Sequence, residues 1–193
     1  MGYTSNAVAN EPLVTAERLA AEPPPFACEL VAGRVVKMSP AGVPHTVVVG
    51  LVNAALSRWA DQHDAGLVTS GEGGYLVRRD PDSVRAPDVA FLTWETLARG
   101  AGAASTYFPT APDLAVEVLS PADTWLDVEA KVHEYLAAAG RAVWVLNPQS
   151  QTVHVFRASL PATVLTRDDA LEGGDVLPGF SARVVTLFEL PKR

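Results

Sequence analysis

The sequence DLAVEVL at residues 113–119 decides the fold. Apolar residues fill this stretch apart from its first residue and Glu117, a pattern typical of a central strand buried on both faces. The pair Ser120-Pro121 ends the strand, and residues 124–139 then show helical spacing up to a stop at Gly140. A buried strand followed directly by a helix predicts a sheet with a helix on one face.

The segments on either side of this unit predict a mixed α/β fold. Apolar residues recur at three- and four-residue steps from Pro44 to about Gln62, as the buried stripe of a helix requires. Residues 29–31 and 34–38 flank Ala32-Gly33, which predicts an N-terminal β-hairpin. Further candidate strands lie at 67–69, 75–77, 87–92, 143–146 and 152–156. The order predicts an α/β or α+β domain with a mixed β-sheet flanked by helices.

Composition places the chain among globular proteins. It has 193 residues, of which 48% are hydrophobic and 19% charged. We expect an N-terminal arm over residues 1–25, which ends in three prolines, and a single domain over residues 26–193. The chain has neither a long uncharged apolar run nor the apolar stretch of a signal peptide, so we expect a cytoplasmic protein without membrane contact. The single Cys28 excludes an intramolecular disulfide.

The formal net charge of −7 is opposite to that of proteins that hold nucleic acid mainly through its phosphates. This charge argues against tight, non-specific DNA binding. It is compatible with a nuclease, because carboxylates that bind a divalent metal add negative charge to the metal-free protein.

Two carboxylates could carry chemistry. Glu117 lies among apolar strand residues, where an ionised carboxylate is costly unless it is paired or bound to metal. Asp88 follows Pro87 at the start of another apolar strand. Two such groups on neighbouring strands can bind Mg²⁺ and leave coordination sites for water and a phosphate oxygen. The alternatives are a solvated edge-strand glutamate and an aspartate that caps a turn.

The helix after Glu117 carries Asp127, Lys131 and Tyr135 on one face, because they are four residues apart. Lys131 could point into a cleft and stabilise charge on a phosphate. The alternative is an ordinary surface ion pair between Lys131 and Asp127.

Other candidates have weaker support from the sequence. Glu29 on the first strand and His45 in the opening turn of the long helix could support the site, or could be ordinary solvated and hydrogen-bonding residues. Arg78, Arg79 and Arg85 could contact phosphates, although acidic neighbours dilute their charge.

Ordered motifs run from about Glu29 to Phe156. They are ELVAG at 29–33, MSP at 38–40 with His45 after it, RAPDV at 85–89, PDLAVEVLSP at 112–121, Asp127, Lys131, Tyr135, Gly140 and VWVLNP at 143–148. Together they resemble the Uma-type restriction endonuclease family of the PD-(D/E)XK nuclease superfamily.

This resemblance implies a restriction endonuclease-like core and a set of roles. Asp88 and Glu117 would bind Mg²⁺ or Mn²⁺ together with the Val118 carbonyl, Lys131 would be the catalytic lysine, and Glu29 would support the metal or its water. His45 joins the expected catalytic set, with Tyr135 and Asp127 as possible accessories. One departure stands out: the superfamily's usual lysine lies two residues after the acidic residue, and that position here is Leu119.

Two functional hypotheses follow. The first is an endonuclease that uses a divalent metal to hydrolyse phosphodiester bonds in DNA. The second is a catalytically inactive interaction or regulatory module with the same fold, which we expect to be homodimeric; the net acidity and the displaced lysine motivate it. Metal-free chemistry by a pair of carboxylates, as in glycoside hydrolysis, is a third and weaker option.

Overall fold

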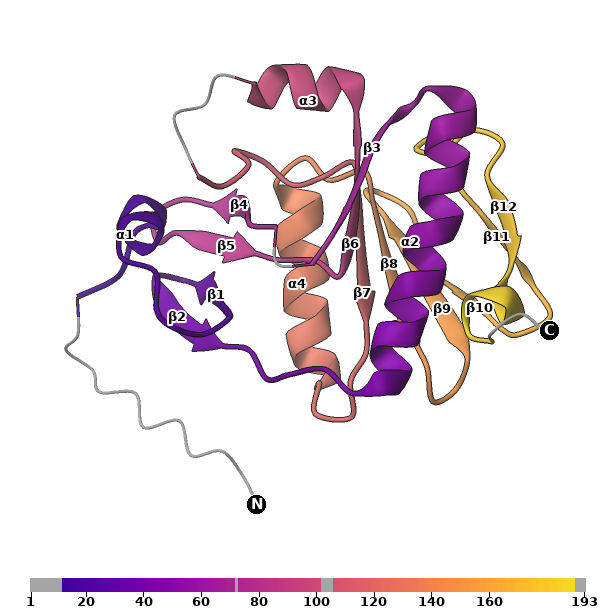
Figure 1. The fold of residues 1–193 in the computed structure, drawn as a ribbon, viewed down its shortest axis with the longest axis horizontal. Coiled ribbons are helices and arrows are strands. Elements are labelled where there is room, and N and C mark those ends of the chain that lie inside the picture. Colours follow the sequence, from indigo (N-terminus) through magenta and orange to yellow (C-terminus); the bar gives the residue numbers. More distant parts are fainter. Residues whose placement is uncertain (1–11, 72, 102–105, 190–193) are drawn as a thin grey trace.

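The computed structural model describes residues 12–71, 73–101 and 106–189. Its centre is a mixed six-stranded sheet with the strand order β10-β9-β8-β7-β6-β3 (Figure 1). The pair β7 and β8 is parallel, and the other neighbours are antiparallel. The strands are β3 (Gly66–Ser70), β6 (Val89–Thr93), β7 (Leu114–Val118), β8 (Ala142–Asn147), β9 (Thr152–Arg157) and β10 (Thr163–Leu165).

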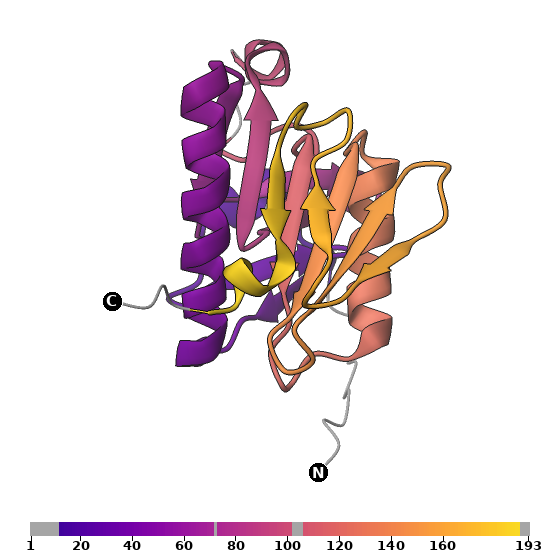
Figure 2. The ribbon, with the colours of Figure 1, turned by 90° about the vertical axis from the view of Figure 1, so that its right-hand side faces the viewer.

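The long helices α2 (Val43–His63) and α4 (Trp125–Ala137) cover opposite faces of this sheet, as Figure 2 shows. Leu56 of α2 belongs to a core cluster with Phe91 and Val116, whereas Val132 of α4 belongs to a second cluster with Ala115 and Val143. Successive residues of β7 thus point alternately to the two helices, as a buried strand requires. The predicted mixed sheet flanked by helices is confirmed, and both long helices begin and end within two residues of their predicted bounds.

A smaller sheet lies beside α4, with the strand order β2-β1-β5-β4. Its strands are β1 (Cys28–Val31), β2 (Arg34–Lys37), β4 (Tyr75–Arg78) and β5 (Ser83–Arg85). The predicted hairpin is present: β1 and β2 pair antiparallel across a turn in which Ala32 and Gly33 have φ values of 50° and 73°. Both values lie in the left-handed region, as a tight two-residue hairpin turn needs.

The sequence pattern does not identify the short elements on either side of β6. The strand β5 has only three residues, and its Ser83 and Arg85 are buried polar groups, so no apolar alternation identifies it. The helix α3 (Trp94–Gly100) is short and has one buried residue. The remaining C-terminal elements are β11 (Ala170–Glu172), β12 (Ser181–Arg183) and the 3₁₀ helix η1 (Val184–Leu187).

Part of the predicted N-terminal arm is packed on the smaller sheet. Helix α1 (Ala16–Ala21) buries Ala16 and Leu19 in a cluster with Leu30 and Val84, and the Ala16 N–H donates to the Asp82 carboxylate at 2.8 Å. Residues 1–11 of the arm lie outside the described residues, and the division of the chain at residue 25 stays a prediction. In the part of the chain that the structure describes, no helix has the length and apolar character needed to cross a bilayer.

Candidate active site

The sheet register brings the two predicted carboxylates together. Strands β6 and β7 are antiparallel, with Val89 opposite Val116. Extending this register by one residue sets Asp88 opposite Glu117, and residues opposite each other point to the same face. The carboxylates are close enough for the charge of Asp88 to raise the pKa of Glu117.

Glu117 is buried, with 7% of its surface exposed, and both carboxylate oxygens are engaged from α4. Lys131 Nζ lies 2.9 Å from Oε2, and the Tyr135 hydroxyl donates to Oε1 at 2.7 Å. The four-residue spacing puts both donors on one helix face, as the sequence predicted. Lys131 therefore points at the sheet, whereas Asp127 accepts a hydrogen bond from Thr124 at the helix start. The alternative of an Asp127–Lys131 surface ion pair is not what the structure contains.

A second carboxylate reaches Lys131 from the smaller sheet. Glu29 Oε1 lies 3.3 Å from Lys131 Nζ, and Oε2 lies 2.8 Å from the guanidinium of Arg85. Arg85 also contacts Glu134 through Nε at 2.6 Å. A continuous chain of ion pairs thus runs from Glu134 through Arg85, Glu29 and Lys131 to Glu117, and it joins the smaller sheet, α4 and the central strand β7.

Asp88 is held by two groups from other elements. Its Oδ2 accepts a hydrogen bond from the Val118 N–H at 2.7 Å and lies 3.3 Å from His45 Nε2 on α2. The bond to Asp88 raises the pKa of His45, and the backbone carbonyl of Val118 adds to this shift. The other ring nitrogen of His45, Nδ1, is buried and has no hydrogen-bond partner among the described residues. Asp88 thus bonds across the sheet, and the predicted alternative of a locally capping aspartate does not describe it.

Burial and neighbouring charges shift the pKa values of several groups in this cluster. Burial raises the pKa of Glu117 to about 7; Lys131 opposes the shift, while Asp88 and Glu29 add to it. Burial acts to lower the pKa of Lys131, but Glu117 and Glu29 outweigh it and raise that pKa above its ordinary value. Burial thus makes Glu117 hold a proton more readily, whereas the neighbouring carboxylates keep Lys131 charged. Burial and the charge of Glu117 also keep Tyr135 neutral, because they raise its pKa well above the usual value.

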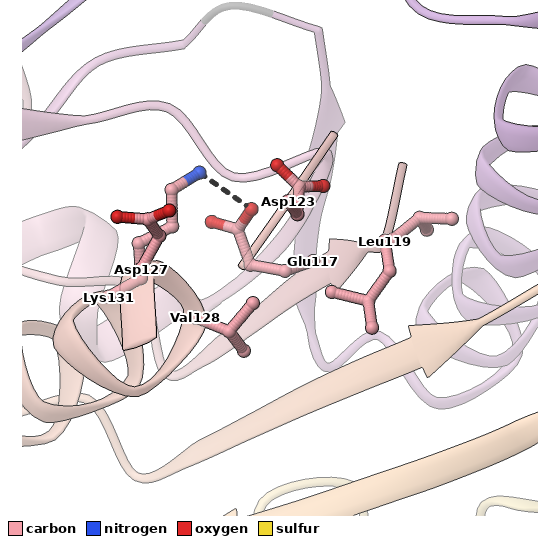
Figure 3. A pocket seen from close by; sticks show the side chains of 7 residues that line it. Glu117, Leu119, Asp123, Asp127, Val128 and Lys131 are labelled. Atoms are coloured by element: carbon pink, nitrogen blue, oxygen red, sulfur yellow. Dashed lines mark hydrogen bonds and ion pairs between the residues drawn. The ribbon is translucent and has the colours of Figure 1, made fainter. Parts of the chain in front are cut away.

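A small pocket opens beside Glu117, as Figure 3 shows. Its volume, including the open mouth, is about 280 Å³. Glu117 and Lys131 meet on one side of it, and Asp123 and Asp127 come from the loop before α4 and from its first turn. The full lining is Glu117, Val118, Leu119, Asp123, Asp127, Val128 and Lys131. The space suits an ion with its water shell and part of a phosphate better than a drug-sized ligand.

The donor chemistry fits a hard divalent cation. Among the described residues, no group of three or more His, Cys, Asp or Glu side chains is arranged to hold a metal. Mg²⁺ does not need such a cage, because it commonly takes one or two carboxylates and keeps several waters. The carboxylates of Asp88 and Glu117 and the Val118 carbonyl would supply oxygen ligands of the kind that such a cation takes.

The structure brings together most residues predicted for the site, and it pairs each of the three arginines predicted to contact phosphate with a carboxylate. Arg85 is buried, and its guanidinium is engaged by two carboxylates. Arg79 pairs with Glu17 and Asp82 beside α1. Arg78 lies 3.9 Å from Glu134 and donates to the Pro81 carbonyl. The residues that the structure gathers are Glu29, His45, Asp88, Glu117, Val118, Lys131 and Tyr135, with Asp127 at the pocket.

Sequence analysis missed two residues of this region. Glu134 anchors Arg85, and also accepts a hydrogen bond from Ser83 at 3.3 Å. Its position three residues after Lys131 puts it on the same helix face, which was the available signal. Asp123 lines the pocket and contributes to the raised pKa of His45. Its role as a loop hydrogen-bond acceptor for the Ser120 N–H gave no reason to single it out.

The raised pKa of Glu117 has a measurable effect on the stability of the metal-free protein. The unfolded chain loses the Glu117 proton near pH 4.5, whereas the folded chain keeps it to about pH 7. Between these values the folded state binds more protons, so the free energy of unfolding falls as pH rises, by roughly 3 kcal/mol in total. Glu117→Gln has no such proton to lose, so its free energy of unfolding should not show this fall. As pH rises over that range, we expect the variant to become more stable relative to wild type.

Urea unfolding in the presence of a chelator, from roughly pH 4 to pH 8, measures this difference. The exposed Glu129 on the same helix gives the matched control, because Glu129→Gln changes the same charge outside the cluster. Parallel stability profiles for wild type and Glu117→Gln would contradict the assigned electrostatics.

Comparisons with known proteins agree with this architecture. Residues 14–186 match the family described as "Uma2: Putative restriction endonuclease". No curated protein matches the chain. One similar solved structure is described as "a putative nuclease belonging to DUF820 from Anabaena variabilis", with a TM-score of 0.78 and 18% identity. The similarity covers 91% of this chain and 97% of that one, and at this identity it shows a shared fold.

Proposed function

Because the chain belongs to the Uma2 family of restriction endonuclease-like proteins, we propose that it is a Mg²⁺- or Mn²⁺-dependent endonuclease that hydrolyses phosphodiester bonds in DNA. One observation carries the proposal. Asp88 and Glu117 adjoin each other, and Glu117 meets the Lys131 ammonium group at the edge of the pocket. A structural ion-pair network gains nothing from two adjoining carboxylates, one of them buried, whereas a site for a divalent cation uses both.

In the proposed reaction, a water oxygen bonds to phosphorus while a phosphodiester P–O bond breaks, and the leaving oxygen takes up a proton. The carboxylates of Asp88 and Glu117 and the Val118 carbonyl would hold the cation. Bound Mg²⁺ or Mn²⁺ would polarise the phosphate and lower the pKa of a bound water.

Lys131 has an electrostatic role in this proposal. Its pKa is raised above the ordinary lysine value, so the side chain is an ammonium at neutral pH and is not a base. A fixed ammonium beside the reacting phosphate stabilises the negative charge that builds up there. In the superfamily the usual lysine lies on the strand two residues after the acidic residue, where this chain has Leu119. Lys131 takes its place, because helix α4 brings the Lys131 amine to Glu117.

The remaining residues position these groups. Tyr135 donates a hydrogen bond to Glu117 and fixes the orientation of its carboxylate. His45 holds Asp88, and Glu29 is a second carboxylate that holds Lys131. We infer that Arg85 acts through Glu29, since a buried guanidinium that holds two carboxylates has little freedom to contact DNA.

Cleavage of supercoiled and linear DNA tests the proposal. We expect nicking or linearisation that requires Mg²⁺ or Mn²⁺ and stops when a chelator removes it. Intact DNA at every metal concentration would favour the alternative of an inactive interaction module. Homodimerisation and cytoplasmic location stay predictions.

Metal binding is expected to stabilise the folded protein. At a Mn²⁺ concentration about 100 times the Kd, stabilisation is about 2.7 kcal/mol. For a chain of this size that raises the Tm by roughly 5–10 °C. Asp88→Asn is expected to lose most of the rise, whereas the exposed control Asp168→Asn keeps it. A metal-independent Tm in the wild type would remove the basis for a cation site.

A further inference from the structure

Strand β2 forms an exposed basic edge next to the proposed active site. All four of its residues, Arg34 to Lys37, are exposed, and β2 is the outer strand of the smaller sheet. The chain has no Asp or Glu between Glu29 and Asp61. This long acid-free segment stands out in a protein with a net charge of −7. We propose that Arg34 and Lys37 on this edge bind the phosphate backbone of the DNA substrate.

The basic side chains nearer the pocket are already engaged. Arg78, Arg79 and Arg85 each contact a carboxylate, and Lys131 lies between Glu29 and Glu117. A guanidinium in such a pair must give up its partner before it can neutralise a phosphate. The backbone contacts that a DNA-binding surface requires therefore have to come from other cations.

Arg34 and Lys37 are available for this role. Within residues 12–71, 73–101 and 106–189, neither has a carboxylate within ion-pair distance. Lys37 Nζ lies 5.3 Å from the centre of the Phe26 ring. A cation over an aromatic face keeps its charge and is held above the ring. It therefore remains able to bind an anion.

The register links this edge to the active site. Val36 pairs directly with Glu29 across the hairpin, and Glu29 contacts Lys131. Arg34 lies two residues from Val36 and so shares the face of Glu29, whereas Lys37 lies next to Val36 along the strand. Arg34 and Lys37 are three residues apart, so their side chains leave the strand on opposite faces of the sheet. A DNA strand that lies along the edge of β2 can then be contacted from both sides.

This inference rests on the proposed function, because it names the surface that holds the substrate of that same site. Its electrostatic signature is the dependence of binding on salt. Each phosphate contact contributes about 0.9 to the slope of log affinity against log salt concentration for duplex DNA. Removing two contacts lowers the slope by about 2.

The test measures binding of a fluorescently labelled DNA duplex by anisotropy over a series of salt concentrations, with Ca²⁺ in place of Mg²⁺. The double variant Arg34→Gln/Lys37→Gln is expected to bind about tenfold more weakly at low salt, with the slope reduced by about 2. The control Arg58→Gln/Arg183→Gln removes the same charge from exposed positions on α2 and β12. It is expected to match wild type within about twofold.

The outcomes separate this inference from the function on which it rests. If wild type cleaves DNA and the two double variants lose affinity equally, the effect is one of net charge and only the inference fails. The inference also fails if only the Arg34/Lys37 variant loses DNA affinity but its salt slope equals that of wild type. An unaltered slope means that no phosphate contact was removed. If wild type neither binds nor cleaves DNA, the proposed function fails as well. Equal melting temperatures in the metal-free state confirm that the double variants are folded.

Discussion

Glu117→Gln is expected to reduce metal-dependent DNA cleavage by at least about 10³-fold. A neutral amide supplies one neutral oxygen in place of a charged carboxylate, so the pocket loses charge where the cation would bind. A barrier increase of about 4 kcal/mol corresponds to that loss. The amide has the shape of the carboxylate and can still meet Lys131 and Tyr135, so the fold should persist.

Initial rates of plasmid nicking measure this effect. Glu129→Gln is the matched control on the exposed side of α4 and is expected to cleave like wild type. Lys131→Met is expected to lose about 10²- to 10³-fold, as removal of a charge-stabilising donor does. If Glu117→Gln and Lys131→Met nick DNA at the wild-type rate, the nuclease in the preparation is a contaminant.

Arg85→Met is expected to lower the free energy of unfolding by about 3–5 kcal/mol. The change leaves the buried carboxylate of Glu29 and the partly buried carboxylate of Glu134 without their shared partner, and an uncompensated buried charge costs this much. For a chain of this size the Tm falls by roughly 10 °C. Cleavage below the melting temperature should also slow, because Glu29 no longer holds Lys131 in place.

Urea and thermal unfolding of the variant measure this loss. Arg79→Met serves as control, because Arg79 is half exposed and its ion pairs lie beside α1; the expected change is within about 1 kcal/mol. The result separates two roles for Arg85. A phosphate contact, as the sequence suggested, predicts weaker DNA binding with little change in stability. A positioning residue predicts the large loss of stability.

Arg85 and Lys131 differ in how well the sequence around them predicts their place in the fold. Lys131 could be assigned to a cleft because Glu117 and Tyr135 lie close to it in sequence and share the strand-to-helix unit. Arg85 occurs in a basic stretch, RRDPDSVR, that is typical of an exposed loop. Its partners Glu29 and Glu134 lie about 50 residues away on either side, and no period in the sequence connects them. Only the pairing of β1 with β5 and the packing of α4 bring the three together.

The sequence by itself determined the central strand, its two covering helices and the hairpin. It also determined that the carboxylates of Asp88 and Glu117 lie at apolar strands. These features follow from side-chain periodicity and turn chemistry, which act over a few residues. Tertiary structure alone decided that Arg85 is buried, that Glu134 belongs to the ion-pair chain, and that Arg34 and Lys37 on β2 have no ion-pair partner among the described residues. Those facts depend on which distant groups meet after folding, because the state of a charged side chain is set by its spatial neighbours and its burial.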